Sequence, residues 1–131
     1  MEIGPLVSRA VLTVKPGDSI RDAAVSMIER GVGSAVVMAD GKPSGIITDR
    51  ESLRAVAEDI DPNGATVSDY MVSRVTTATP STELLDAARI MRDKGFRHLV
   101  VVDDSGELFG VFSMRDLVVG LLQDRASSAP A

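Results

Sequence analysis

The chain has 131 residues, of which 44% are hydrophobic and 25% charged, a composition typical of a globular domain. It contains no cysteine, which excludes disulfides and thiolate metal sites. The net charge of −5 argues against binding to the phosphate backbone of DNA or RNA. No apolar run approaches the ~20 residues of a membrane span. We therefore expect a cytoplasmic protein with no nucleic-acid or membrane partner, in which a small anionic ligand would need only a local positive patch.

The first half of the chain predicts short strands alternating with helices. Apolar residues recur at helical spacing between Ile20 and Gly31, and a glycine at this place is typical of the residue that ends a helix. Asp18 or Ser19 is the candidate N-cap of this helix. The other predicted elements of this half are strands at Val11–Val14, Ala35–Met38 and Gly45–Thr48 and a helix at Glu51–Glu58.

The second half predicts the same elements in the same order. A linker at residues 59–64 leads to one short helical turn at Val67–Met71. The next helix has Ser81 or Thr82 as its candidate N-cap and ends at Gly95. The other predicted elements of this half are strands at Val75–Ala78, Leu99–Val102 and Gly110–Ser113 and a helix at Asp116–Asp124.

The two halves are copies of one unit. At an offset of 64 residues (86 − 22), the triplet Asp22–Ala24 aligns with the identical triplet Asp86–Ala88. After one inserted residue the offset becomes 65 (110 − 45), and Gly45 then aligns with Gly110. Many further residues match at these two offsets with a single gap, which chance does not produce. The sequence therefore contains an internal repeat.

The duplication predicts the fold. Each copy is only about 60 residues long, which is too small to bury a sound core alone. We therefore expect one structural unit of the α/β (α+β) class, in which two tandem β-α-β-β-α repeats pack sheet to sheet about a pseudo-twofold axis. The first repeat spans residues 1–62, the second spans 63–126, and a disordered tail follows at 127–131.

In both repeats a hydroxyl residue, an arginine and a carboxylate stand where a buried strand meets a helix. A strand that ends just before a helix leaves backbone N–H groups without partners, and these suit a phosphate. A carboxylate one turn into the helix accepts hydrogen bonds from the two hydroxyls of a ribose. The combination therefore favours a nucleotide. The residues are Thr48, Arg50 and Glu51 in the first repeat and Ser113, Arg115 and Asp116 in the second.

The same residues also have a purely structural interpretation. Thr48-x-x-Glu51 matches the capping box, and Ser113-x-x-Asp116 is a shortened form of it. Either motif could serve only to begin a helix. The two roles are compatible, because a cap can open when an anion offers better partners.

The ordered set of these features resembles the CBS domain pair, or Bateman module. It includes the duplicated unit, the helix-start motifs, Val67-x-Asp69-x-Met71 and the segment Gly95–Val101, and it covers roughly residues 6–124. The resemblance implies a module that binds adenosine-containing ligands in clefts between the two repeats. It also implies dimerisation into a flat disc, and regulation of a partner without catalysis.

Site residues follow from the resemblance position by position. It implies that Ser113 binds phosphate and Asp116 binds the ribose hydroxyls in one cleft, and that Thr48 and Glu51 do so in the other. Glu51 stands where the family prefers Asp, and the segment Gly4–Val7 lacks the Val-x-Asp-x-Met pattern. Both departures concern the first repeat, so we expect the second site to bind more tightly.

Further ligand-binding candidates come from strand ends. Arg97 and His98 precede the strand Leu99–Val102, where the family often has basic residues that reach phosphates. The alternative is a solvated strand end. His98 is the only histidine and there is no cysteine, which argues against a zinc site. The remaining candidates are Arg50, Arg115 and the aligned pair Thr13 and Thr77.

The segment Leu117–Leu122 is apolar on almost every side. A surface helix usually has one apolar stripe, so this helix needs two partners, its own sheet and a second subunit. The alternative is deeper burial within the monomer. We favour a homodimer.

Together these features predict a stand-alone, non-catalytic regulatory module. Its ligand is an adenosine-containing nucleotide such as AMP, ADP, ATP, S-adenosylmethionine or NAD, with no obligatory cofactor and no metal. The module would signal to a partner protein in trans. The alternative is a structural dimerisation or adaptor protein with vestigial clefts.

Overall fold

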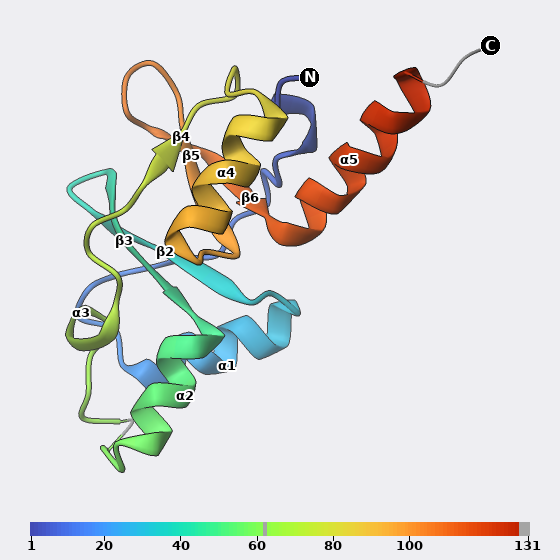
Figure 1. The fold of residues 1–131 in the computed structure, drawn as a ribbon. Coiled ribbons are helices and arrows are strands. Elements are labelled where there is room, and N and C mark those ends of the chain that lie inside the picture. The colour runs from blue at the N-terminus through green and yellow to red at the C-terminus, as the bar shows by residue number, and fades with distance from the viewer. Residues whose placement is uncertain (62, 129–131) are drawn as a thin grey trace. The chain divides into compact units, whose positions relative to one another are not determined.

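The computed structural model describes residues 1–61 and 63–128. They form two compact units, each with one three-stranded sheet (Figure 1). The first-repeat unit is Val11–Val75. The second-repeat unit combines Met1–Ala10 with the described residues from Thr76 onward. The expected mixture of helices and two small sheets is confirmed.

The first-repeat unit has the sheet order β1-β2-β3. The central strand runs parallel to β1 and antiparallel to β3. Its elements are β1 (Thr13–Val14), α1 (Ile20–Arg30), β2 (Ser34–Ala39), β3 (Lys42–Thr48), α2 (Asp49–Ala57) and α3 (Val67–Tyr70).

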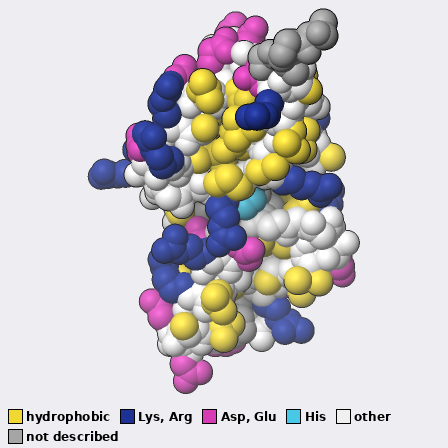
Figure 2. Space-filling model, turned by 45° about the vertical axis from the view of Figure 1, so that its right-hand side comes forward, with side chains coloured by type: hydrophobic (Ala, Val, Ile, Leu, Met, Phe, Trp, Pro, Cys, Tyr) yellow, Lys and Arg dark blue, Asp and Glu magenta, His cyan; other side chains and the backbone are white. Residues whose placement is uncertain are grey.

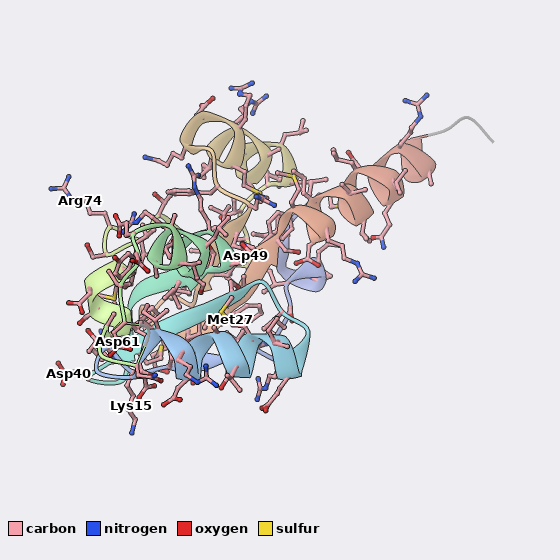
Figure 3. All side chains as sticks on the ribbon, turned by 90° about the horizontal axis from the view of Figure 1, so that it is seen from below. Lys15, Met27, Asp40, Asp49, Asp61 and Arg74 are labelled. Atoms are coloured by element: carbon pink, nitrogen blue, oxygen red, sulfur yellow. The ribbon has the colours of Figure 1, made fainter. Side chains whose placement is uncertain are left out.

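The helix α1 has the ends that the sequence predicts. The Ser19 hydroxyl accepts a hydrogen bond from the Asp22 N–H at 3.0 Å, which makes Ser19 the N-cap. The helix ends at Gly31, whose φ of 64° lies in the left-handed region that favours glycine. Figure 3 shows Met27 directed from α1 toward the strands, and Met27 is buried there. Ile28, which also has helical spacing, is instead 82% exposed.

The second-repeat unit repeats this topology with the sheet order β4-β5-β6. Its core includes Phe112 and Met91, both almost completely buried. Its elements are the 3-10 turn η1 (Gly4–Leu6), β4 (Thr77–Ala78), α4 (Leu84–Lys94), β5 (His98–Val102), β6 (Leu108–Ser113) and α5 (Met114–Ser128).

Two sequence predictions for this unit are wrong in detail. The N-cap of α4 is Glu83 rather than Ser81 or Thr82, and it makes no side-chain cap. The Thr82 hydroxyl is occupied by the Thr79 N–H, and the N–H of Leu84 instead donates to the carbonyl of Met1 at 2.8 Å. A backbone carbonyl from the N-terminus therefore accepts a hydrogen bond from the first N–H group of α4.

The second wrong prediction concerns the tail at 127–131. The helix α5 continues to Ser128, past the predicted end at Asp124, and the next two residues, Arg125 and Ala126, both favour a helix. Residues 129–131 lie outside the described part of the chain.

Each unit includes a short lead-in segment that precedes the other repeat along the chain. The N-terminal lead-in, Met1–Ala10, belongs to the second-repeat unit, and the linking lead-in, residues 65–75, belongs to the first-repeat unit. Ser8 and Val111 exchange two backbone hydrogen bonds of 3.0 Å. Val72 and Ile46 exchange the equivalent pair, at 2.9 and 3.0 Å. The compact units consequently differ from the sequence repeats 1–62 and 63–126.

These lead-ins explain the glycine that lies within the third strand of each repeat, Gly45 in β3 and Gly110 in β6. A Cβ on Gly110 would lie 2.3 Å from the carbonyl oxygen of Ser8. A Cβ on Gly45 would lie 2.7 Å from the sulfur of Met71 and 2.9 Å from the carbonyl oxygen of Val72. Only glycine lets the lead-in approach the strand this closely.

The sheet-to-sheet packing of the repeats stays a prediction. It is based on the small size of each copy, and the apolar runs at Ala35–Ala39 in β2 and Leu99–Val102 in β5 are compatible with it. Within the described residues, no helix has both the length and the hydropathy to cross a membrane.

Candidate functional site

The candidate site of the second repeat lies where β6 ends and α5 begins. The N–H of Ser113 donates to Asp116 Oδ2 at 2.8 Å, and the N–H of Asp116 donates to Ser113 Oγ at 3.2 Å. These reciprocal bonds form the capping box that the spacing predicts. The Met114 N–H donates to the carbonyl of Arg97 at 2.8 Å. The hydroxyl and the carboxylate are therefore held together at the positive end of the α5 dipole.

The strand β5 brings two basic candidates to the same place. His98 stands opposite Ser113 in the antiparallel register of β5 and β6, and Arg97 precedes it. Arg97 and Arg115 are exposed, and His98 is half-buried. Neither arginine forms an ion pair with another residue that the structure describes. This end of the unit therefore combines a capped helix start with two arginines that form no ion pair within the described part of the chain.

The first repeat has a different arrangement at the start of α2. Thr48 is the N-cap, but its side chain accepts no bond from the helix backbone. Its hydroxyl instead donates to Glu51 Oε2 at 2.5 Å. The carboxylate of Glu51 is buried, with only 6% of the residue exposed. It is the one buried charged residue in the described part of the chain.

The capping box predicted at Thr48 and Glu51 is therefore not formed. Glutamate has one methylene more than aspartate, and its carboxylate reaches the threonine hydroxyl instead of the backbone N–H of Thr48. The Thr48 hydroxyl then acts as a donor to Glu51, and it does not accept a hydrogen bond from the N–H groups in the first turn of α2. The Asp49 N–H donates to the carbonyl of Gly33 at 3.1 Å, as the Met114 N–H does to Arg97 in the other repeat.

The first repeat also lacks the basic pair. Ser34 stands opposite Thr48 in the register of β2 and β3, where the second repeat has His98 opposite Ser113. Arg50 is exposed on the first turn of α2. The candidate ligand-binding residues at this helix start are therefore Thr48, Glu51 and the single arginine Arg50.

Two candidates, Thr13 and Thr77, lie farther from the helix starts. Thr13 is on β1 and pairs with Val36, and Thr77 is on β4 and pairs with Val100. Both are exposed. The central strand of each sheet separates these threonines from the strand that ends at the helix start.

Sequence reasoning missed a contact that fixes the linking lead-in to α2. The hydroxyl of Tyr70 donates to a Glu58 carboxylate oxygen, and this hydrogen bond raises the pKa of Tyr70. The guanidinium of Arg54 lies 4.9 Å from the centre of the tyrosine ring. A single tyrosine after a short helical turn is a weak signal, so these partners became visible only in the structure. No group of three or more acidic or histidine side chains suited to a metal ion occurs in the described residues.

Comparison with known proteins gives a consistent result. The model of the CBS domain family matches residues 3–58 and again residues 67–122. An uncharacterised 17.7 kDa protein of Acidianus ambivalens is 38% identical over 123 residues, covering 92% of this chain and 73% of the relative. The chain spans 61% and 43% of two further archaeal relatives, from Methanopyrus kandleri and Methanocaldococcus jannaschii.

Solved structures are similar over almost the whole chain. A CBS domain protein from Pyrobaculum aerophilum, complexed with AMP, is 30% identical with a TM-score of 0.87, covering 98% of this chain and 100% of that one. CBSX2 in complex with AMP is 27% identical with a TM-score of 0.81, covering 95% of this chain and 98% of that one. Two similar proteins of known structure thus carry AMP.

Proposed function

Because the chain belongs to the CBS domain family, we propose that it is a regulatory module that binds an adenosine-containing nucleotide and changes the activity of a partner protein in trans. The observation that carries the proposal is the start of α5. A hydroxyl, a carboxylate and cationic side chains meet there, and similar proteins have been crystallised with AMP. The chain acts as a binding module without catalysis of its own.

In the second repeat, each side chain has a role that its geometry permits. Asp116 accepts hydrogen bonds from the ribose hydroxyls, for which its half-buried carboxylate is accessible. Ser113 turns its hydroxyl from the Asp116 N–H toward a phosphate oxygen, and the phosphate takes over the first-turn amides. Arg97 and Arg115 supply positive charge close to these groups, and His98, opposite Ser113, adds an imidazole that can hydrogen-bond to the ligand. The capping box is the ligand-free state of this site.

In the first repeat, binding is weaker. The Glu51 carboxylate must leave its buried position and its bond to Thr48 before it can reach a ribose. Exchanging a charge-assisted hydrogen bond for another gains little free energy, because the first bond is lost. The smaller residues at positions 33 and 34 add no positive charge. One nucleotide is therefore bound tightly per chain, in the second repeat.

A ligand panel in a thermal-shift assay tests the proposal. AMP, ADP, ATP, S-adenosylmethionine and NAD are each added at millimolar concentration. A ligand at 100 times its Kd stabilises the folded state by about 2.7 kcal/mol, which raises the Tm of a domain of this size by several degrees. AMP is the ligand we expect to act. If no compound raises the Tm, the nucleotide-binding proposal is wrong.

A second function is favoured by the state of Glu51. A buried carboxylate held by a neighbouring hydroxyl is sufficient to stabilise a helix start without any ligand. If both helix starts serve only this purpose, the chain is a dimerisation or adaptor protein. The ligand panel separates the two functions, because an adaptor would keep the same Tm with all five compounds.

The proposed module is a homodimer. The helix α5 exposes an apolar surface, although part of the apolar run predicted as a contact is used within its own unit. Leu117 is buried, and a Cβ on Gly120 would lie 2.7 Å from Leu6 Cδ1. Figure 2 shows apolar side chains gathered on the upper part of the face in view. The exposed ones on α5 are Met114, Val118, Val119, Leu121 and Leu122.

A further inference from the structure

The N-terminal lead-in is attached to β6 just before the candidate site of the second repeat. Ser8 exchanges backbone hydrogen bonds of 3.0 Å with Val111, and Val111 lies two residues before Ser113, where the strand ends. Next to this bridge, the guanidinium of Arg9 lies 3.7 Å from the centre of the Phe109 ring. Backbone and side-chain contacts thus fix the lead-in to the strand that carries the hydroxyl of the site.

The same lead-in packs on α5 just after the candidate site. A Cβ on Gly120 would lie 2.7 Å from Leu6 Cδ1, so the leucine lies directly against the helix backbone there. Gly120 follows Asp116 by four residues, which places the two on the same face of the helix, one turn apart. The lead-in therefore contacts the strand before the site and the helix after it, across the junction where β6 ends and α5 begins.

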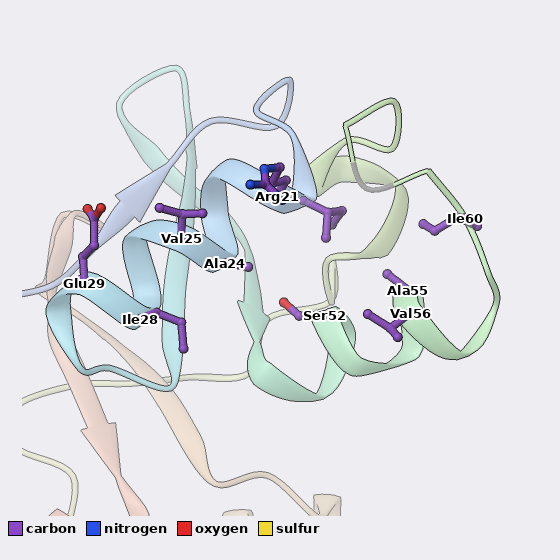
Figure 4. Close-up of a pocket in the computed structure, with 10 residues that line it drawn as sticks. Arg21, Ala24, Val25, Ile28, Glu29, Ser52, Ala55, Val56 and Ile60 are labelled. Carbon is purple, nitrogen blue, oxygen red and sulfur yellow. The ribbon is translucent and has the colours of Figure 1, made fainter.

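The first repeat lacks the contact on its helix. Ala55 of α2 aligns with Gly120 of α5 at the offset of 65 (120 − 55). Together with Ser52 it lines an open apolar groove between α1 and α2 (Figure 4). The other residues that line this groove come from the same two helices and from Ile60, and none belongs to the linking lead-in. The first-repeat unit thus leaves open the space that Leu6 occupies beside the helix of the second repeat.

The linking lead-in contacts α2 in a different way. Tyr70 aligns with Leu6 at the offset of 64 (70 − 6), and its hydroxyl donates to Glu58, the residue at which α2 ends. The tyrosine ring also contacts the guanidinium at the end of the Arg54 side chain. These contacts are made through long side chains, whereas Leu6 lies directly against the backbone of α5. The N-terminal lead-in is therefore the one that holds a helix start closely in place.

We propose that docking of the N-terminal lead-in is coupled to nucleotide binding, with Leu6 and Ser8 as positioning residues of the second-repeat site. The nucleotide needs the Ser113 hydroxyl and the Asp116 carboxylate at a fixed separation, and these groups lie on either side of the junction that the lead-in spans. When the lead-in leaves, α5 is free to turn about this junction. The inference rests on the proposed function, and it names the segment through which binding reaches a partner protein.

Coupling between two equilibria is reciprocal. If the nucleotide binds only while the lead-in is docked, a smaller docked fraction raises the apparent Kd, and the nucleotide in turn suppresses undocking. AMP at 100 times its Kd should lower the undocked population by a factor of about 100. A lead-in that only stabilises the fold would change the free energy of unfolding and leave the Kd of the folded protein unchanged.

Proline substitution at the bridge tests the coupling in the full chain. Ser8→Pro removes the N–H that donates to Val111, and the preceding residue, Val7, already has the extended conformation that a following proline favours. Calorimetry with AMP should show the Kd raised at least about fivefold. Leu6→Ala removes the contact on α5 and should also raise the Kd, so the test does not depend on the folding of one variant.

Matched controls lie at the aligned bridge of the first-repeat unit. Val72→Pro removes the N–H that donates to Ile46, and Met71 before it is likewise extended. This variant should leave the Kd of the tight AMP site unchanged. Ser8→Ala retains both backbone bonds to β6 and should leave that Kd unchanged as well. Urea denaturation without ligand shows, for each variant, whether the loss of affinity merely follows the loss of stability.

Amide hydrogen exchange tests the reverse direction on the unaltered chain. AMP at 100 times its Kd should slow exchange of the Ser8 amide roughly 100-fold, because the lead-in can undock only after AMP leaves. The Val72 amide, which is bonded to Ile46 in the first-repeat unit, should exchange at an unchanged rate. Equal slowing of both amides would mean that AMP stabilises the whole chain without a separate lead-in step, and this result would overturn the coupling.

The outcomes separate this inference from the proposed function. If AMP binds wild type, Ser8→Pro and Leu6→Ala with the same Kd, the coupling is wrong and the nucleotide site is unaffected. If Val72→Pro weakens AMP as much as Ser8→Pro does, the assignment to the N-terminal lead-in is wrong. If the wild type binds no AMP, the coupling fails as stated, and the panel of five compounds then decides the proposed function by itself.

Discussion

The starts of α2 and α5 occupy equivalent positions in the two repeats, yet their hydrogen bonds differ. In the second repeat Ser113 and Asp116 cap the backbone and stay accessible. In the first repeat Thr48 donates to a buried Glu51, and the backbone has no side-chain cap. One methylene in the acidic side chain separates an accessible capping box from a buried contact between two side chains. Duplicated sequence motifs therefore need not give duplicated hydrogen bonds.

The two lead-ins provide a second comparison, in which the repeats agree. Ile3 and Val67 align at the offset of 64 (67 − 3), and both are fully buried. The sequence around them differs, since one lead-in forms a 3-10 turn with Pro5 and the other an α-helical turn with a capping box at Thr66. The two lead-ins thus share two features: a buried aliphatic side chain, and a backbone hydrogen-bond bridge to the third strand of the unit.

The largest effect on stability is expected for the anchor residues. Ile3→Ala should lower the free energy of unfolding by about 3–4 kcal/mol, because it leaves a cavity in the second-repeat core. Val67→Ala removes fewer methyl groups and should cost about 2 kcal/mol in the first-repeat unit. Urea denaturation measures both. A loss below about 1 kcal/mol for Ile3→Ala would show that the N-terminal lead-in is not required for the fold.

The next largest effect concerns the glycines beneath the lead-ins. Gly110→Ala should cost about 3 kcal/mol, because the new Cβ meets a backbone oxygen that cannot move without breaking the bridge at Ser8. Gly45→Ala should cost less, about 2 kcal/mol, because the side chain of Met71 can move and the new Cβ lies 2.9 Å from the Val72 carbonyl oxygen, against 2.3 Å from that of Ser8 at Gly110. Thermal and urea unfolding of the two variants give the comparison. Equal losses would mean that the two lead-ins approach their strands equally closely.

A smaller effect separates the two helix starts. Thr48→Ala should cost about 2 kcal/mol, because it leaves the buried Glu51 carboxylate without its donor. Ser113→Ala removes an ordinary cap and should cost about 1 kcal/mol. Thr48→Ser retains the hydroxyl, so this control variant should show the smallest loss in the free energy of unfolding, which urea denaturation measures for all three. If Ser113→Ala proves the more destabilising of the two alanine variants, the difference in bonding described for the two repeats is wrong.

Local patterns were sufficient to predict most of the fold. Strand and helix positions, the N-cap Ser19 and the stop at Gly31 follow from periodicity and short-range signals. The start of α4 could not be predicted, because its partner is the Met1 carbonyl, more than 80 residues away. The compact units differ from the sequence repeats for the same reason, since each lead-in joins its unit through backbone hydrogen bonds to residues far away in the sequence.

The candidate site was predicted in part. The sequence identified Ser113 and Asp116, and the register of β5 and β6 places Arg97 and His98 beside them. The inequality of the repeats was expected from Glu51, but its burial was not, because a charged residue one turn into a helix is normally solvated. The groove at Ser52 was missed entirely, since one serine in a helix carries no signal of the space around it.

Calorimetry with AMP on Asp116→Ala and Glu51→Ala tests the central claim, that the second repeat holds the working site. Losing a hydrogen bond to a charged group costs about 1.5–3 kcal/mol, so Asp116→Ala should weaken the tight binding event by roughly 10- to 150-fold. Glu51→Ala should leave that event nearly unchanged. Unfolding of both variants without ligand controls for the loss of a first-turn acid. If Glu51→Ala abolishes tight binding while Asp116→Ala preserves it, the working site belongs to the first repeat and the account is contradicted.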